Sequence, residues 1–119
     1  MTREIKFRAW DKKENKMWGK AFPKMFIADD SFGFTNDELY EIMQYTGLKD
    51  KNGKEIYEWD ILEEGSWIGW CNKCCGFQPM YEYENTEECH RCEGNYEIGD
   101  IIKLEKIIGN IYENPELLK

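Results

Sequence analysis

Apolar and polar residues alternate over short stretches of this chain, a pattern typical of β-strands rather than of long helices. In the first such stretch, residues 4–10, apolar side chains fall on one side and basic side chains on the other. The apolar members are Ile5, Phe7 and Ala9, and the basic ones are Lys6 and Arg8. The sequence therefore predicts a half-buried strand here, a polar turn over 11–16 and a return strand from Met17.

Two interpretations compete for the segment before residue 47. Thr35 to Glu38 has the spacing of a helix capping box, and apolar residues follow it at helical spacing. This pattern predicts a short helix near 36–43. The alternative is a strand that ends in residues 43–46, because tyrosine and threonine favour a pleated surface. Residues 24–28 are a further candidate strand.

Turn residues divide the second half of the chain into more short strands. The predicted turns are residues 50–53, which contain Asn-Gly, and residues 64–65. Strand patterns occupy residues 55–62, 67–70, 98–104 and 107–111. Asn114 before Pro115 is typical of a helix start, so a short terminal helix is expected. The elements together predict a mainly-β fold, either a sandwich or a small, partly open β-barrel (SH3-like or similar), with a short C-terminal helix.

The strongest chemical signal is a repeated cysteine motif. Cys-x-x-Cys-x-Gly occurs at residues 71–76 and again at residues 89–94. Two residues between cysteines let a tight turn aim both thiolates at one point, and we expect Gly76 and Gly94 to supply the positive φ that such turns often need. Two facing turns then give four thiolates at tetrahedral corners, which is the ligand set of a closed structural Zn²⁺ site. The predicted ligands are Cys71, Cys74, Cys89 and Cys92.

The remaining cysteine and the lone histidine leave some alternatives open. Cys75 aligns with Glu93 in the second copy, so it falls outside the predicted ligand set, and His90 is either a bystander or an alternative ligand. A disulfide pair in a secreted protein is the alternative to zinc. Residues 1–6 contain no apolar run, so we expect no signal peptide. An unpaired fifth cysteine also fits a reducing, cytoplasmic compartment better.

Composition narrows the classes of partner. The 119 residues include 24 acidic and 16 basic side chains, which gives a formal net charge of −8. This charge repels phosphate backbones, so tight non-specific DNA binding is not expected unless the basic residues gather on one face. Exposed tryptophans are typical anchors for partners, and the candidate binding residues are Trp59, Trp67 and Trp70, with burial in a β-rich core as the alternative. No stretch approaches the ~20 apolar residues of a membrane span.

Residue types that support catalysis are sparse. The chain has one histidine, and no base motif stands beside either serine, Ser31 or Ser66. The glycines are too dispersed to form a phosphate-binding loop. A four-cysteine zinc site has no open coordination position, so it cannot activate water. We therefore expect a protein that is not an enzyme.

Three stretches of sequence carry a family resemblance. They are residues 3–11, REIKFRAWD, residues 43–61, MQYTGLKDKNGKEIYEWDI, and residues 108–118, IGNIYENPELL. Together they resemble the YopX-like proteins of bacterial phages and prophages. The resemblance implies a single mainly-β domain over residues 1–119, with a small barrel, in a protein made in the cytoplasm of the bacterial host during infection. It implies no particular reaction.

Two features depart from the pattern of that family. Trp59 stands where the family usually has glycine, so we expect that the turn before Asp60 differs or that the indole covers a surface which the family leaves open. The cysteine segment, at about 71–94, is interpreted as a zinc-ribbon-like insertion whose order depends on the metal.

The function that these observations favour is a non-catalytic protein-interaction module of a phage, which binds a host or phage protein and modulates a nucleic-acid enzyme. The acidic balance suits a target with a basic surface. One alternative is single-stranded nucleic-acid binding in phage replication, because zinc ribbons and small barrels serve that purpose. Another is capture of a small nucleotide by a homo-oligomer, which would require a deep pocket lined by Tyr, Trp and Arg.

Overall fold

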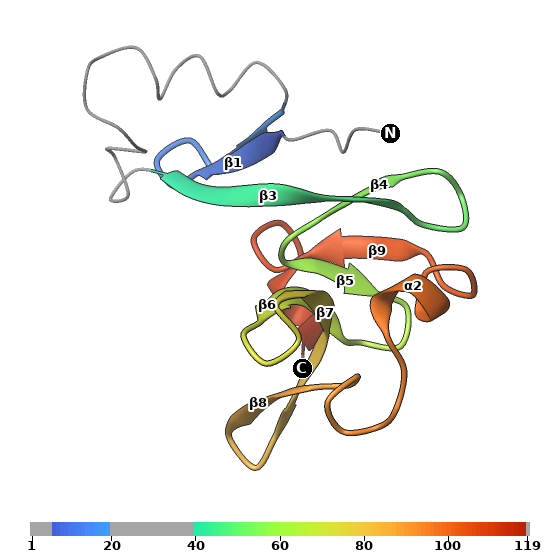
Figure 1. Ribbon diagram of the computed structural model, residues 1–119. Helices are drawn as coiled ribbons and strands as arrows, with labels where there is room; N and C mark the ends of the chain where they lie inside the picture. The colour runs from blue at the N-terminus through green and yellow to red at the C-terminus, as the bar shows by residue number, and fades with distance from the viewer. Residues whose placement is uncertain (1–5, 20–39, 119) are drawn as a thin grey trace. The chain divides into compact units, whose positions relative to one another are not determined.

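The computed structural model describes residues 6–19 and 40–118, and its regular structure is mainly β (Figure 1). The chain divides into two compact units, Met1–Tyr45 and Thr46–Lys119. The candidate strand at 24–28 lies outside the described residues. The single-domain organisation over residues 1–119 stays a prediction.

A three-stranded antiparallel arrangement forms the described part of the first unit. Its strands are β1 (Phe7–Asp11), β2 (Lys16–Trp18) and the first residues of β3 (Tyr40–Lys49). The carboxylate of Asp11 closes the β1–β2 turn, because its Oδ1 accepts the backbone N–H groups of Lys13 and Glu14 at 3.0 Å. The strand predicted over 4–10 is therefore confirmed from Phe7 onward, as is its return strand, while residues 4 and 5 lie outside the described part of the chain.

Both faces of β1 are covered, which differs from the predicted half-buried strand. Ala9 is fully buried, yet Lys6 and Arg8 on the opposite side are only 8% and 9% exposed. The Lys6 ammonium lies 4.7 Å from the centre of the Tyr45 ring, and Arg8 Nε donates to Met43 Sδ at 3.4 Å. Long basic side chains can cover apolar neighbours in this way because their stems are apolar.

The competition between helix and strand before residue 47 is decided in favour of the strand. Residues 40–43 belong to β3, so the predicted helix is wrong over these residues, and residues 36–39 lie outside the described part. Pairing explains the outcome, because Phe7 and Asp11 of β1 stand opposite Gln44 and Tyr40 of β3. Cross-strand hydrogen bonds and aromatic side chains favour the extended form here more than the capping pattern favours a helix.

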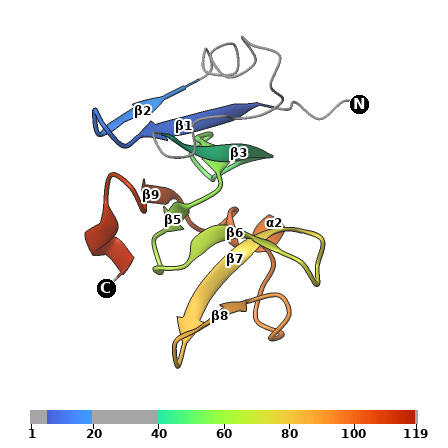
Figure 2. The same ribbon diagram turned by 90° about the vertical axis from the view of Figure 1, so that its left-hand side faces the viewer.

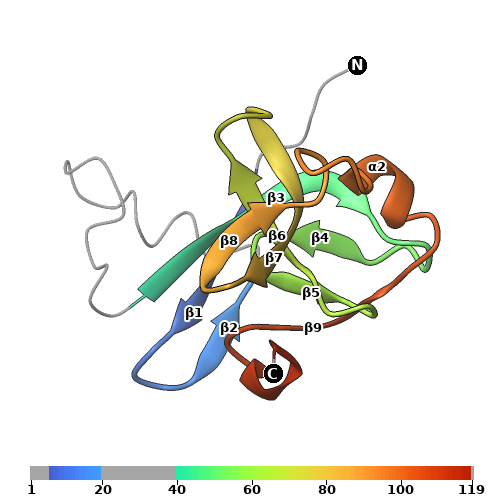
Figure 3. The ribbon, with the colours of Figure 1, turned by 90° about the horizontal axis from the view of Figure 1, so that it is seen from below.

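The second unit contains a five-stranded sheet, in the order β8-β7-β6-β5-β9 (Figures 2 and 3). Its strands are β5 (Asp60–Leu62), β6 (Trp67–Cys71), β7 (Gly76–Tyr83), β8 (Thr86–Cys89) and β9 (Ile107–Asn110). A further strand, β4 (Glu55–Tyr57), neighbours β3. Within the described residues neither sheet closes on itself, as expected for a partly open barrel, and the predicted mainly-β class is confirmed.

A tight turn interrupts the strand that was predicted over 55–62. Trp59 has a φ of +70° and separates β4 from β5, so the prediction of one continuous strand is wrong. The Trp59 N–H donates to the carbonyl of Ile68 at 2.7 Å, and its carbonyl accepts from the Ile111 N–H at 3.1 Å. The predicted turn at 50–53 is confirmed, because the Gly53 N–H donates to the Asp50 carbonyl at 2.9 Å and Gly53 has a φ of +83°.

The core of the second unit is aliphatic. Its buried members are Ile56, Leu62, Ile68, Ile98, Ile101, Ile102 and Ile107. The strand predicted over 98–104 is wrong, because residues Ile98–Ile101 form the short helix α2. Three buried isoleucines at positions i, i+3 and i+4 make one helical face, and this spacing outweighs the strand preference of isoleucine.

The chain ends in the 3₁₀ helix η1 (Pro115–Leu118), which confirms the predicted short C-terminal helix. The Leu117 N–H donates to the Asn114 carbonyl at 3.0 Å. Gly109 of β9 lies directly beneath this turn, where a Cβ atom would come within 2.8 Å of Asn114 Cγ and 2.9 Å of Leu117 Cδ1. No helix in the described part of the chain is both long and apolar enough to cross a membrane.

Candidate metal centre

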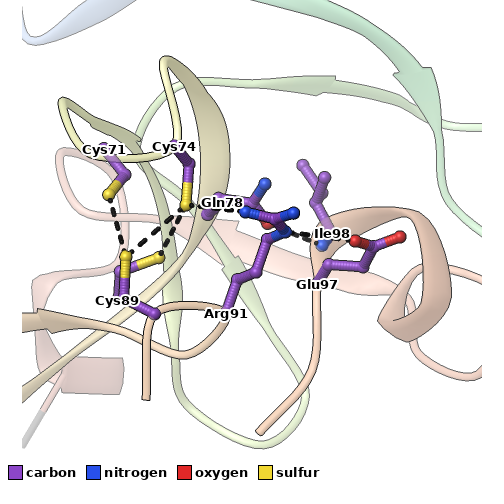
Figure 4. A network of polar contacts seen from close by, with 8 residues as sticks. Cys71, Cys74, Gln78, Cys89, Arg91, Glu97 and Ile98 are labelled. Atoms are coloured by element: carbon purple, nitrogen blue, oxygen red, sulfur yellow. Dashed lines mark hydrogen bonds and ion pairs between the residues drawn. The ribbon is translucent and has the colours of Figure 1, made fainter. Parts of the chain in front are cut away.

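The four predicted cysteine ligands lie together at one end of the β6–β7–β8 meander. Cys71 is the last residue of β6 and Cys89 the last of β8, while Cys74 and Cys92 lie in the turns that follow. The antiparallel pairing places Cys71 opposite Gly76 and Cys89 opposite Met80, which lies four residues further along β7, so pairing alone does not bring the two cysteines together. All four Sγ atoms lie within 4.8 Å of one another (Figure 4).

The spacing of the sulfur atoms fits a tetrahedral metal ion. Sγ–Sγ distances are 3.6 Å for Cys71–Cys92, 3.9 Å for Cys74–Cys89 and 3.5 Å for Cys74–Cys92. Four sulfurs each about 2.3 Å from one zinc ion at tetrahedral angles would be separated by about 3.8 Å. All five cysteines are free thiols, so the structure contains none of the disulfides of the alternative interpretation.

Both turns present their first cysteine to backbone N–H groups in the same way. The N–H groups of Cys74 and Lys73 donate to the sulfur of Cys71, and those of Cys92 and Arg91 donate to the sulfur of Cys89. Such donors stabilise a thiolate over a thiol. The hydrogen bond from the Cys74 N–H is the main reason that the pKa of Cys71 falls to about 7. We call the segments 71–76 and 89–94 the first and second knuckle.

Crowding of the sulfurs has the opposite effect on their neighbours. Contact with the sulfurs of Cys74 and Cys71 raises the pKa of Cys92 to about 12, and burial raises the pKa of Cys89. Four negative charges at these distances repel one another strongly unless a cation lies between them. The donor set therefore suits a divalent ion that binds all four as thiolates.

The fifth cysteine lies outside the cluster, as the repeat predicts. The Cys75 thiol is exposed and lies 3.4 Å from the carbonyl oxygen of Asn72. The two knuckles differ in where the left-handed residue occurs, because Gly94 has a φ of +80° but Gly76 opens β7 and Cys75 has a φ of +54°. The expectation of a positive φ is thus correct for Gly94 and wrong for Gly76.

The lone histidine is held in an aromatic stack outside the sulfur cluster. The His90 ring lies between Tyr81 and Tyr96, with ring centres 4.2 Å and 4.3 Å away. Its Nδ1 is 3.0 Å from the side-chain nitrogen of Asn95, and burial lowers the pKa of the imidazole. The stack joins the second knuckle to β7. No spacing in the sequence indicates it, because the three rings come from separate segments.

A polar network links the sulfurs to the start of α2 (Figure 4). Arg91 Nη1 donates to Cys74 Sγ at 3.4 Å, and Arg91 Nε donates to Glu97 Oε2 at 3.3 Å. One residue further on, the Ile98 N–H donates to the side-chain oxygen of Gln78 at 2.9 Å. Sequence reasoning missed this network, and the only available signal was the basic residue inside the second knuckle.

Comparison with known proteins decides the family. The family model described as YopX protein matches residues 6–119, which includes both knuckles. This chain belongs to the YopX family. The crystal structure of protein EF1440 from Enterococcus faecalis is similar over 99% of this chain and 100% of that chain, with a TM-score of 0.60 and 27% sequence identity. No curated protein matches the chain.

The three candidate tryptophans of this YopX-family chain have different surroundings. Trp70 of β6 is 51% exposed and packs edge-on against Phe77, with ring centres 5.2 Å apart. Trp67 is partly buried against the cluster of Cys71, Met80 and Cys89, and its Nε1 has no hydrogen-bond partner among the described residues. Trp67 and Trp70 are three residues apart on one strand and so lie on opposite faces. Trp59 is half-buried in its turn.

A surface hollow lies beside the sulfur cluster. Its volume is about 360 Å³, and its lining includes Trp70, Lys73, Glu87, Glu88 and Glu93. Three carboxylates against one ammonium make the hollow acidic. This lining differs from the Tyr, Trp and Arg pocket that nucleotide capture would require, because the hollow contains neither tyrosine nor arginine.

Proposed function

We propose that Cys71, Cys74, Cys89 and Cys92 bind one structural Zn²⁺ ion. The observation that supports the proposal is the closeness of the four sulfurs, which all lie within 4.8 Å of one another and within 3.5–3.9 Å in three pairs, together with the paired N–H···S bonds of the two knuckles. Four thiolates fill the coordination of zinc, so the ion would act on folding and not on a substrate.

Elemental analysis of the purified protein tests the metal site. The expected result is one zinc per chain, retained in Cys75→Ser and lost in a Cys89→Ser, Cys92→Ser double variant. Cys75→Ser is the matched control because it removes a thiol next to a ligand without altering the cluster. Loss of zinc in Cys75→Ser would show that this cysteine belongs to the ligand set, and absence of metal in the wild-type protein would contradict the proposal.

The zinc-ordered meander would then serve as a protein-interaction surface, in a non-catalytic accessory protein made during phage infection. Support comes from membership of the YopX family and from the half-exposed ring of Trp70 beside an acidic hollow. An exposed tryptophan next to carboxylates suits a partner with apolar and basic groups. We propose a host or phage protein with a basic surface as the partner, such as a nucleic-acid enzyme.

Affinity capture from infected host cells tests the interaction. A partner that binds through this surface is recovered with the wild-type protein, and much less of it with Trp70→Ala or with the Cys89→Ser, Cys92→Ser double variant. Leu104→Ala is the matched control, because Leu104 is exposed but lies outside the meander. Equal recovery of the same partner with Trp70→Ala would place the interaction elsewhere on the protein.

A further inference from the structure

The two knuckles carry a basic residue at the same position but use it differently. Lys73 and Arg91 each directly precede the second cysteine of their motif. Arg91 reaches across to the other knuckle and donates to Cys74 Sγ at 3.4 Å. Within the described residues, the Lys73 side chain makes no such bond to a sulfur. The two knuckles therefore match in the positions of their cysteines, but only the basic residue of the second knuckle bonds to a sulfur of the other.

The negative charge of the metal site explains how the bond from Arg91 to Cys74 can stabilise it. A zinc ion with four thiolates has a formal charge of −2, and Glu87, Glu88 and Glu93 line the hollow beside it. These carboxylates repel the negatively charged zinc–thiolate centre and so destabilise the metal-bound form. An N–H donor from a cation opposes this, since it withdraws charge from the sulfur to which it bonds.

The position of Arg91 is itself fixed by a second contact. Its Nε donates to Glu97 Oε2 at 3.3 Å, and Glu97 directly precedes the helix α2, whose Ile98 and Ile101 are buried in the core. The Arg91 and Glu97 side chains are 52% and 49% exposed. The ion pair alone is therefore weak, and its effect lies in directing the guanidinium toward the sulfur.

We propose that Arg91 is a positioning residue for the metal site, which joins the two knuckles by bonding to Cys74 and so strengthens retention of the metal. The inference rests on the proposed zinc site. The contact would hold Cys74 near the other three sulfurs before metal binds, and would make its thiolate less reactive afterwards. Lys73 supplies charge near the same site without this bond.

A pair of variants, Arg91→Gln and Lys73→Gln, separates positioning from charge, because each removes one positive charge at the equivalent position of a knuckle. Zinc affinity is measured by competition with a chromophoric chelator. Arg91→Gln is expected to lower the affinity about tenfold, the lower end of the range for residues that support metal ligands. Lys73→Gln is expected to change it by less than about twofold, because salt screens an exposed charge that makes no direct contact. Equal losses in the two variants would overturn the proposal.

Two further measurements detect the hydrogen bond itself. With Co²⁺ in place of zinc, loss of an N–H···S bond raises the energy of the sulfur lone pair, so the thiolate-to-metal absorption of Arg91→Gln should shift to longer wavelength. That of Lys73→Gln should not shift. Glu97→Gln should lower zinc affinity by less than Arg91→Gln does, although it removes a negative charge. A higher affinity in Glu97→Gln, or an unshifted cobalt band in Arg91→Gln, would show that only net charge matters.

These outcomes are distinct from failure of the zinc proposal. If wild-type protein binds neither Zn²⁺ nor Co²⁺, the four-cysteine site itself is wrong. If wild-type protein binds both and Arg91→Gln matches it in affinity and spectrum, the zinc site stands and the role of Arg91 is wrong.

Discussion

Trp59 has a backbone conformation that its own side chain disfavours. A non-glycine residue in the left-handed region costs about 1–2 kcal/mol relative to the usual conformation. Hydrogen bonds from the Trp59 N–H to Ile68 and from the Ile111 N–H to Trp59 hold the residue at a φ of +70°. A glycine adopts this φ readily, so the tryptophan occupies a turn whose geometry suits glycine, the residue that the family resemblance leads us to expect at this position.

Replacement of Trp59 by two small residues isolates this strain. Trp59→Gly and Trp59→Ala both lose the packing of the indole, but only the alanine keeps the unfavourable φ. We expect Trp59→Gly to be more stable than Trp59→Ala by about 1 kcal/mol, the reverse of the order found in regular strands and helices. Urea unfolding of both variants measures the difference. An alanine variant that is the more stable of the two would show that the turn relaxes without cost.

Asp50 is a buried carboxylate that organises the chain around it. It is 6% exposed, and its oxygens accept backbone N–H groups from Asn52 at 2.8 Å, Lys54 at 3.0 Å and Ile107 at 2.8 Å. Burial alone would raise its pKa, but the three N–H donors outweigh burial and lower the pKa below the ordinary value of 3.8. The hydrogen bonds that Asp50 accepts from the turn and from β9 are therefore strongest when its carboxyl group is ionised.

The sign of the pH dependence follows from this depressed pKa. A carboxyl whose pKa is lower in the folded state adds stability above its unfolded pKa, and this stability disappears as the pH falls through the folded value. We expect Asp50→Asn to unfold more easily at pH 7 by about 1–3 kcal/mol and to lose less further stability in acid than the wild-type protein. Exposed Asp100→Asn is the control. Parallel acid profiles for wild type and Asp50→Asn would contradict this role of Asp50.

Sequence patterns at the scale of single residues identified the cysteine cluster but not its surroundings. A repeated motif indicates which thiols face one another, so the sequence alone identifies four cysteines and excludes Cys75. The bond from Arg91 to Cys74 and the stack around His90 depend on side chains from distant segments, and no local spacing encodes them. Tertiary packing decides such contacts.

At the scale of elements, strands and turns were predicted where local chemistry determines them. The Asn52-Gly53 turn and the β1–β2 turn are examples. Two of the errors lie where two periodicities fit the same residues. Isoleucines at 98, 101 and 102 fit both a strand by composition and a helix by spacing, and the helix is observed. Residues 40–43 fit a helix by spacing, and pairing with β1 makes them a strand instead.

The β6–β7–β8 meander should depend on the metal more than the rest of the second unit does. Met80 of β7 and Cys89 of β8 pack in the cysteine cluster, whereas Leu62 of β5 and Ile107 of β9 are buried in the isoleucine core. Phe77 of β7 is the point at which the meander also contacts that core. Removal of zinc with a chelator is expected to speed amide exchange across residues 71–94, and to leave exchange in Ile107–Asn110 nearly unchanged. Hydrogen–deuterium exchange with mass spectrometry provides the measurement. Loss of strand signal across the whole chain, by circular dichroism, would show that the knuckles belong to the core.

At the scale of the whole molecule, charge argues against binding to nucleic acid. The formal net charge is −8, and of the two basic residues in the knuckles Arg91 is already engaged by Glu97 and Cys74. Each phosphate contact needs a basic group that displaces counterions, and the acidic hollow beside the sulfurs repels the backbone. Any remaining affinity of this acidic chain for nucleic acid would have to come from stacking of bases on its exposed aromatic side chains.

We therefore expect no binding to single- or double-stranded DNA below roughly 10 μM at physiological salt. Fluorescence anisotropy with labelled oligonucleotides measures the dissociation constant, and the titration is repeated over a range of salt concentrations. Trp70→Ala separates the two sources of any weak binding: stacking on the exposed ring would be lost in this variant, while phosphate contacts would remain and weaken steeply with salt. Tight, salt-sensitive binding that survives Trp70→Ala would require a basic face on this acidic protein and would favour the nucleic-acid function over the protein-interaction function.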